Sequence, residues 1–154
     1  QLQKRIKVWE AVDLWSSLYR RRPIDGERLL DQLGLADKRN AWFMTLSGGQ
    51  KQRLLFALSI CGNPDLLILD EPTVGLDVEA RRAMWEQIRK FVRRGRSILL
   101  TTHYLAEADA LANRVIVIDR GAVIAEGTPA EIKKNAGAVD NLEDAYLALT
   151  QGAH

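Results

Sequence analysis

The chain has 154 residues, 47% of them hydrophobic and 27% charged, which is enough for one globular domain with a sizeable core. Its net charge of +2 is too small to predict a nucleic-acid-binding protein. The single cysteine, Cys61, excludes a framework of disulfides within the chain, and no apolar run reaches the roughly 18 residues of a membrane span.

The first third of the sequence predicts only helices. Apolar residues recur at helical spacing in three segments: 6–20, 27–33 and 50–61. Pro23, Asp25 and Gly26 predict a turn between the first two segments, and Gly34 is expected to end the second helix. We therefore expect an all-helical subdomain over residues 1–62.

The rest of the chain, residues 63–154, alternates between strands and helices. Strands are predicted at 66–69 and 97–101, followed by a hairpin built from 114–119 and 122–125. Helices are predicted at 78–94, 104–112, from Thr128 onward, and at 141–150. Since the first two strands are apolar on both faces, this pattern predicts an α/β fold with a parallel sheet covered on both sides.

Two adjacent acids, Asp70 and Glu71, follow the first predicted strand. Open α/β sheets bind ligands at the carboxyl ends of their strands, so both side chains are expected at that edge. In nucleotide hydrolases with a P-loop, an aspartate in this place holds Mg²⁺, and a second acid can accept a proton from water. Taken alone, the pair is equally well explained as the start of a turn at Pro72.

The stretch LSGGQ, residues 46–50, opens the third predicted helix. Ser47 is a residue type that caps helices, and Gly48 and Gly49 would let backbone N–H groups approach an anion closely. Because the N-terminus of a helix carries partial positive charge, a phosphate would be bound well there. Without further context, a simple helix cap is the better explanation.

A histidine, His103, comes just after the second predicted strand and is therefore expected at the same sheet edge as Glu71. A histidine in that place can hydrogen-bond a phosphate oxygen or position a water molecule. A lone histidine at a strand end is more often structural, so its meaning depends on the surrounding segments.

Four segments in fixed order together resemble the nucleotide-binding domain of ATP-binding-cassette (ABC) proteins: LSGGQKQR (46–53), LLILDEP (66–72), VGLD (74–77) and TTH (101–103). Residues 115–132, VIVIDRGAVIAEGTPAEI, resemble the transporter members, and residues 100–115 and 142–150 are most similar to the ABC-2 drug- or polymer-export ATPases. The resemblance implies a partial P-loop NTPase (RecA-like) sheet core preceded by the N-terminal all-helical signature subdomain of the ABC family.

The resemblance also implies catalytic roles. Asp70 would orient Mg²⁺, usually through water, and Glu71 would be the catalytic base. His103 would contact the terminal phosphate of ATP.

The remaining matched residues would act across a dimer interface. Ser47, Gly48 and Gly49 would contact the terminal phosphate of an ATP held by the opposite subunit, and Gln50 would complete this signature. Asp77 would lie at the centre of a loop that communicates between the subunits. The implied cofactors are ATP and Mg²⁺.

The implied partners are a second nucleotide-binding domain, in a homodimer or heterodimer, and a transmembrane permease subunit; no nucleic acid is expected. The protein would be cytoplasmic and peripheral on the inner face of the cell membrane.

A phosphate cradle of the form G-x-x-x-x-G-K-[ST] does not occur in the sequence, in which no glycine is followed by lysine. In the family it lies upstream of a glutamine loop, for which Gln1 or Gln3 is the candidate here. We therefore expect a fragment that lacks the P-loop and that, alone, does not turn over ATP. Two alternatives stay open: a non-transport ABC ATPase and a catalytically incompetent interaction fragment.

Overall fold

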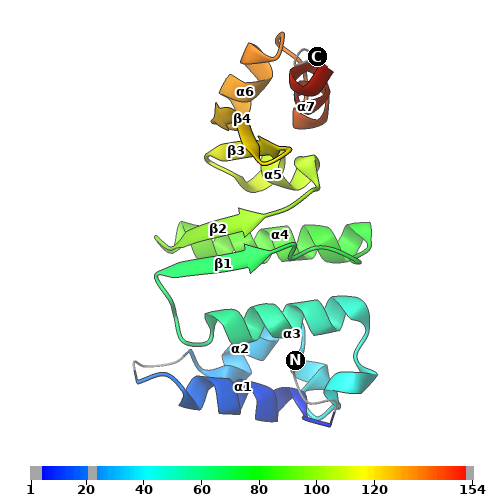
Figure 1. Ribbon diagram of the computed structural model, residues 1–154. Coiled ribbons are helices and arrows are strands. Elements are labelled where there is room, and N and C mark those ends of the chain that lie inside the picture. Colours follow the sequence, from blue (N-terminus) through cyan, green and yellow to red (C-terminus); the bar gives the residue numbers. More distant parts are fainter. Residues whose placement is uncertain (1–4, 21–23, 152–154) are drawn as a thin grey trace. The chain divides into compact units, whose positions relative to one another are not determined.

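A computed structural model describes residues 5–20 and 24–151 and divides the chain into two compact units, Gln1–Thr101 and Thr102–His154 (Figure 1). The candidate glutamine-loop residues Gln1 and Gln3 lie outside the described residues. The subdomain boundary that the sequence suggests, after residue 62, falls inside the first unit and stays a prediction.

The first unit begins with helices and continues with a strand–helix–strand segment. Its elements in chain order are α1 (Val8–Ser17), α2 (Gly26–Gln32), the short 3₁₀ helices η1 (Ala36–Lys38) and η2 (Phe43–Thr45), α3 (Gly48–Ile60), β1 (Leu66–Asp70), α4 (Val78–Arg93) and β2 (Ser97–Thr101).

The predicted helices of this unit are confirmed, with shifted ends. The first is shorter than predicted and ends at Ser17, whereas α3 begins at Gly48, two residues earlier than predicted, because Ser47 caps it. Gly34 follows α2 in the left-handed conformation (φ 62°) that commonly ends helices, as expected. The apolar faces of α1, α2 and α3 form a shared core that includes Val8, Ala11, Val12, Leu29, Leu30 and Leu54.

The strands β1 and β2 pair in parallel, with Leu66 opposite Ser97 and Asp70 opposite Thr101. Such a pair needs a crossover connection, and α4 supplies it, lying alongside the two strands in Figure 1. Leu67 on one face of the pair is buried, as are Met84 and Ile88 of α4. The predicted parallel pairing is confirmed.

The expectation that this sheet is covered on both sides is wrong for the described residues. The face formed by alternate residues, here called the open face, consists of Leu66, Ile68 and Asp70 on β1 and Ser97, Leu99 and Thr101 on β2, and every one of these residues is exposed. Ile68 is 66% exposed and Leu99 57%. The strand pattern indicates side chains suited to burial, but no described segment of this unit covers them.

The second unit is built from α5 (Leu105–Leu111), β3 (Val115–Asp119), β4 (Ala122–Gly127), α6 (Pro129–Asn135) and α7 (Leu142–Gln151). β3 and β4 form the predicted hairpin, which is antiparallel and has an irregularity between Val117 and Ile118. One face of the hairpin packs on a small core with α6 and α7, formed by Val115, Val117, Ile132, Leu142 and Ala145. Ile116, Ile118 and Val123 are exposed.

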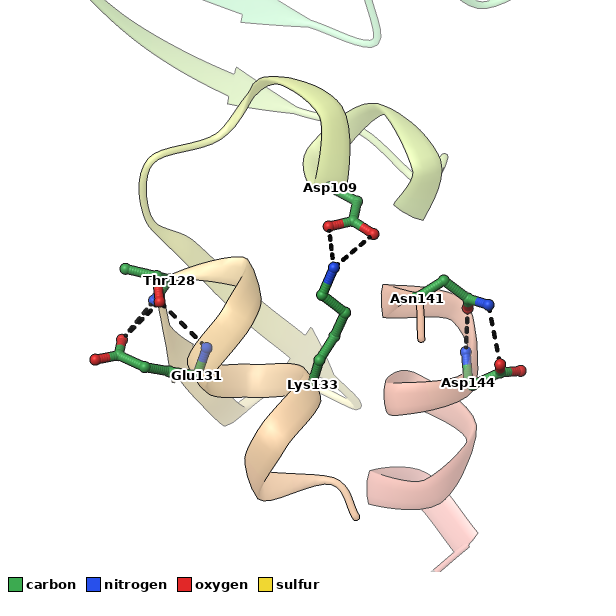
Figure 2. Close-up of polar contacts among 6 residues, drawn as sticks. All are labelled: Asp109, Thr128, Glu131, Lys133, Asn141 and Asp144. Atoms are coloured by element: carbon green, nitrogen blue, oxygen red, sulfur yellow. Dashed lines mark hydrogen bonds and ion pairs between the residues drawn. The ribbon is translucent and has the colours of Figure 1, made fainter. Parts of the chain in front are cut away.

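An ion pair joins two helices of this unit, as Figure 2 shows. The Lys133 ammonium of α6 lies 2.8 and 3.2 Å from the two carboxylate oxygens of Asp109 on α5. Because each side chain is only 23% exposed, solvent screens this pair less than it screens a fully exposed ion pair. It fixes α6 against α5.

The helices α6 and α7 are each capped by the side chain of the residue that precedes them (Figure 2). The Thr128 hydroxyl accepts from the Glu131 N–H at 3.2 Å, and the Glu131 carboxylate accepts from the Thr128 N–H at 2.8 Å. These hydrogen bonds from the Thr128 backbone and hydroxyl hold the pKa of the Glu131 carboxyl below its usual value. Asn141 caps α7 by accepting from the Asp144 N–H at 2.8 Å.

None of the helices in the described part of the chain has both the length and the apolar character that crossing a membrane requires.

Candidate functional site

Ser47 occupies the N-cap of α3 and forms a reciprocal capping box with Gln50. The Ser47 hydroxyl accepts a hydrogen bond from the Gln50 N–H at 3.3 Å, and the Gln50 side-chain oxygen accepts one from the Ser47 N–H at 3.0 Å. Ser47 and Gln50, which belong to the predicted signature, therefore fix the start of the helix. The cap explanation and the phosphate explanation both use this geometry.

The two glycines of the signature help to separate those explanations. Neither Gly48 nor Gly49 has a positive φ, and a Cβ built on Gly48 meets no atom within 4 Å. A Cβ on Gly49 would lie 3.4 Å from the Ala80 Cβ and 3.8 Å from the Leu76 Cδ2, which is ordinary contact. Neither the backbone conformation nor the space around position 48 therefore requires a glycine. A ligand that closely approaches the backbone N–H groups would explain why a glycine occurs at this position.

Asp70 ends β1 at the carboxyl edge of the strand pair, as predicted. Its side chain is exposed on the open face, and its cross-strand neighbour Thr101 donates a hydroxyl hydrogen bond to the Asp70 carboxylate. The bond holds the carboxylate at the sheet edge and leaves its other lone pairs for further ligands.

Glu71 adopts a backbone conformation that is rare for its residue type. Its φ is +47°, in the left-handed region that costs a non-glycine residue about 1–2 kcal/mol. The Glu71 N–H donates to the Thr101 carbonyl at 3.0 Å, so β2 holds the residue directly after the strand. Strain of this kind collects at functional positions, which adds a structural observation in favour of Glu71 as a functional residue.

Asp77 acts as the N-cap of α4. Its carboxylate oxygen accepts a hydrogen bond of 2.7 Å from the Ala80 N–H. The predicted role of Asp77 at a dimer interface stays a prediction, because this contact accounts for the residue type by itself.

His103 is exposed and lies at the start of the second unit, two residues after β2 ends at Thr101. Its ring packs against that of Tyr104, with centroids 4.3 Å apart. Its predicted placement beside Glu71 depends on the arrangement of the two units and stays a prediction.

One contact to this region was not predicted from the sequence. The side-chain amide of Gln52, in the second turn of α3, donates a 2.6 Å hydrogen bond to the Pro72 carbonyl, directly after Glu71. Gln52 belongs to the LSGGQKQR stretch, but residue type alone does not reveal where its side chain points.

The residues present suit the cofactors that the resemblance implies. Mg²⁺ prefers oxygen ligands, keeps several waters, and is usually held by one or two carboxylates together with phosphate oxygens. The exposed Asp70 carboxylate fits that pattern. The N-terminus of α3, with its serine hydroxyl and two glycine N–H groups, fits a phosphate.

Comparison with known proteins gives consistent matches. The sequence model of the family described as "ABC transporter" matches residues 1–74. The chain is 52% identical over 109 residues to the daunorubicin/doxorubicin resistance ATP-binding protein DrrA of Streptomyces peucetius, covering 71% of this chain and 33% of that protein. It is 46% identical over 115 residues to the Nod factor export ATP-binding protein I of Burkholderia thailandensis, covering 75% and 38%.

Among solved structures, the fold matches one described as the ATP binding subunit of an ABC transporter, with a TM-score of 0.79 and 28% identity, over 97% of this chain and 65% of that one. This match confirms the predicted α/β fold class. The chain spans about a third of the length of the curated relatives it matches.

Proposed function

Because the chain belongs to the ABC transporter ATP-binding proteins, we propose that it provides the signature and the catalytic carboxylates of an ATPase that powers export across a membrane. Export is supported by the name of one relative, the Nod factor export ATP-binding protein I, while the other relative is a drug-resistance ATP-binding protein.

The observation that carries the proposal is the pairing of two features within the first unit. One is a capped helix start whose Gly48 the fold does not require, and the other is a strained Glu71 beside Asp70 at the sheet edge. In a dimer of such subunits, the phosphate-binding backbone of one subunit and the pair of acids of the other would meet at one terminal phosphate.

In the proposed mechanism the two acids divide the work. Mg²⁺, when bound, would neutralise charge that develops on the phosphate oxygens. Asp70 would hold the water shell of that ion, and Glu71 would accept a proton from the attacking water. His103 would donate a hydrogen bond to the terminal phosphate.

The signature residues would serve the opposite subunit. Ser47, Gly48 and Gly49 would contact the terminal phosphate of an ATP bound mainly by a second nucleotide-binding domain, and Gln50 would hold Ser47 in place. Asp77 would lie where the two domains meet. The same protein would bind a permease subunit at the cytoplasmic face of the membrane.

A phosphate cradle is needed to complete such a site, and we propose that a segment upstream of these residues supplies it. The proposal predicts that the 154-residue chain alone binds ATP weakly and does not hydrolyse it. A longer protein with a G-x-x-x-x-G-K-[ST] segment should bind ATP and hydrolyse it. If that longer protein does not bind ATP, the interaction-fragment alternative replaces the ATPase. If it hydrolyses ATP but couples to no permease, the non-transport alternative holds.

Replacing Ser47 with arginine in the longer protein should prevent ATP-driven dimer closure while leaving ATP binding to each subunit's own cradle intact. The bulky cation would occupy the place of the partner's terminal phosphate. ATP-dependent dimerisation followed by light scattering, beside nucleotide affinity, measures both effects. Ser17→Arg, at the exposed end of α1, is the control and should change neither. Closure that persists in Ser47→Arg would contradict the contact across the dimer.

Replacing Gly48 with alanine should change stability and function in opposite directions. Since the Cβ meets open space, the free energy of unfolding should rise slightly, by less than the roughly 0.5–1 kcal/mol of a helix interior, because Gly48 is the first residue of α3. ATP-driven dimerisation should weaken at least about tenfold if the methyl group keeps phosphate from the N–H groups. Chemical denaturation and dimerisation assays on the same preparations separate the two effects.

Gly26→Ala is the matched control, because Gly26 is likewise the first residue of a helix. Its Cβ would lie 3.0 Å from a Val12 methyl group, which must shift by a few tenths of an ångström to admit it, and dimerisation should not change. Normal dimerisation of Gly48→Ala would mean that the glycine has no ligand to admit.

A further inference from the structure

We infer that Gln52 is a positioning residue for Glu71: its side-chain amide holds the turn that keeps the Glu71 carboxylate at the sheet edge. The inference deepens the proposed function and rests on it, since it assumes that Glu71 acts on the attacking water.

The contact is long-range and specific. The Gln52 Nε2 donates to the Pro72 carbonyl oxygen at 2.6 Å, and the two residues are 20 positions apart in the sequence. The bond is partly buried, where competition from water is reduced.

Glu71 is therefore held from both sides. On one side, its own N–H donates to the Thr101 carbonyl of β2 at 3.0 Å. On the other side, Gln52 fixes the carbonyl of Pro72, which is itself buried. The Glu71 carbonyl accepts a longer bond of 3.3 Å from the Val74 N–H within the turn.

The left-handed conformation of Glu71 makes this restraint important. A glutamate at φ +47° gains by returning to a negative φ, and it stays where it is only while its neighbours are fixed. A change of φ at Glu71 would swing the side chain away from its place at the strand end. Without the bond from Gln52, the turn has one restraint fewer against that change.

The helix that presents Gln52 is itself anchored by the next residue. The Arg53 guanidinium donates to the carbonyls of Leu33 and Gly34, at 3.1 and 3.2 Å, where α2 ends. Leu33 is the C-cap of α2 and Gly34 is the residue after it, so neither carbonyl belongs to the hydrogen-bond ladder inside the helix. Adjacent side chains of α3 thus hold two different segments: Arg53 bonds to the end of α2, and Gln52 bonds to the turn after β1.

The test uses the longer protein that carries the phosphate cradle. Gln52→Glu keeps the size and helix preference of the side chain but replaces the amide donor with an acceptor that repels the Pro72 carbonyl. We expect kcat for ATP to fall about tenfold, which corresponds to about 1.4 kcal/mol of transition-state stabilisation, with KM within about twofold of the unchanged protein. Gln52→Leu, which cannot hydrogen-bond at all, should behave alike and decides the matter if Gln52→Glu does not fold.

A double substitution distinguishes positioning from a general structural role. With Glu71 already replaced by glutamine, adding Gln52→Glu should leave the residual turnover unchanged within about twofold, because the group it positions is gone. Gln87→Ala, a half-buried glutamine on α4, is the control and should keep full activity.

Three results would overturn the inference: unchanged kcat in folded Gln52→Glu and Gln52→Leu, a loss of ATP affinity equal to the loss of kcat, or a further tenfold loss in the Glu71→Gln background. In each of these the unsubstituted protein still hydrolyses ATP, so the proposed function stands. If Glu71→Gln itself turns over ATP normally, the role of Glu71 fails and the inference about Gln52 fails with it.

Discussion

Replacing Glu71 with glutamine should lower ATP turnover of the longer protein by about 10²–10⁴-fold, the contribution of a well-placed general base. Glutamine keeps the size of the side chain and its place at the end of β1, but it cannot accept a proton from water. ATP binding and dimer closure should therefore persist, and the closed dimer should accumulate. Steady-state hydrolysis, together with the ATP-bound dimer fraction, gives both quantities.

The control for this substitution is Glu79→Gln, in the exposed first turn of α4. It removes the same charge a short distance along the chain and should leave turnover within about twofold, because effects of surface substitutions are small. Equal turnover of the Glu71 variant and the unsubstituted protein would show that the base lies elsewhere. A loss of ATP binding in Glu71→Gln would instead point to a role in holding the nucleotide.

Replacing Ile68 with lysine should reduce association of the short chain but lower the unfolding free energy of the long protein. In the 154-residue chain Ile68 is 66% exposed on the open face, so folding should be nearly unaffected. Because exposed apolar faces and strand edges favour association, we expect the 154-residue chain to self-associate, and the lysine should convert it to a monomer. In the longer protein, where we propose that another segment covers this face, a buried and unpaired ammonium should cost several kcal/mol of unfolding free energy.

Light scattering of the short chain and chemical denaturation of the long protein measure these two effects. Leu147→Lys, at an exposed position of α7, is the control. It should leave the association state of the short chain unchanged and alter the unfolding free energy of the long protein by no more than about 0.5 kcal/mol. A short chain that is monomeric and unfolds in one sharp transition at high temperature would contradict the expected association. A long protein that tolerates Ile68→Lys would show that the open face stays open.

The elements were predictable because their signals are local. The spacing of apolar residues and the Ser47 cap gave α3, and the hairpin of β3 and β4 followed from its turn at Arg120 and Gly121. The exposure of Ile68 could not be predicted in the same way. A run of apolar residues shows that side chains favour burial, but it does not show which segment buries them.

The candidate site was predictable in composition but not in geometry. The sequence places Asp70 and Glu71 at a strand end, yet nothing in the residue type of Glu71 predicts a positive φ, which glutamate rarely adopts. The bond from Gln52 to Pro72 depends equally on how α3 packs against the turn after β1. Both are properties of the tertiary structure.

The reciprocal bonds between Ser47 and Gln50 bear on how quickly the proposed site could respond to nucleotide. A hydroxyl that accepts from a backbone N–H still has its own hydrogen to donate, so Ser47 can keep the helix start in shape and contact an anion at the same time. The segment is thus preorganised, and little conformational entropy remains to be lost when a phosphate arrives. The rate of assembly would then be set by the approach of two rigid surfaces and not by the ordering of a loop.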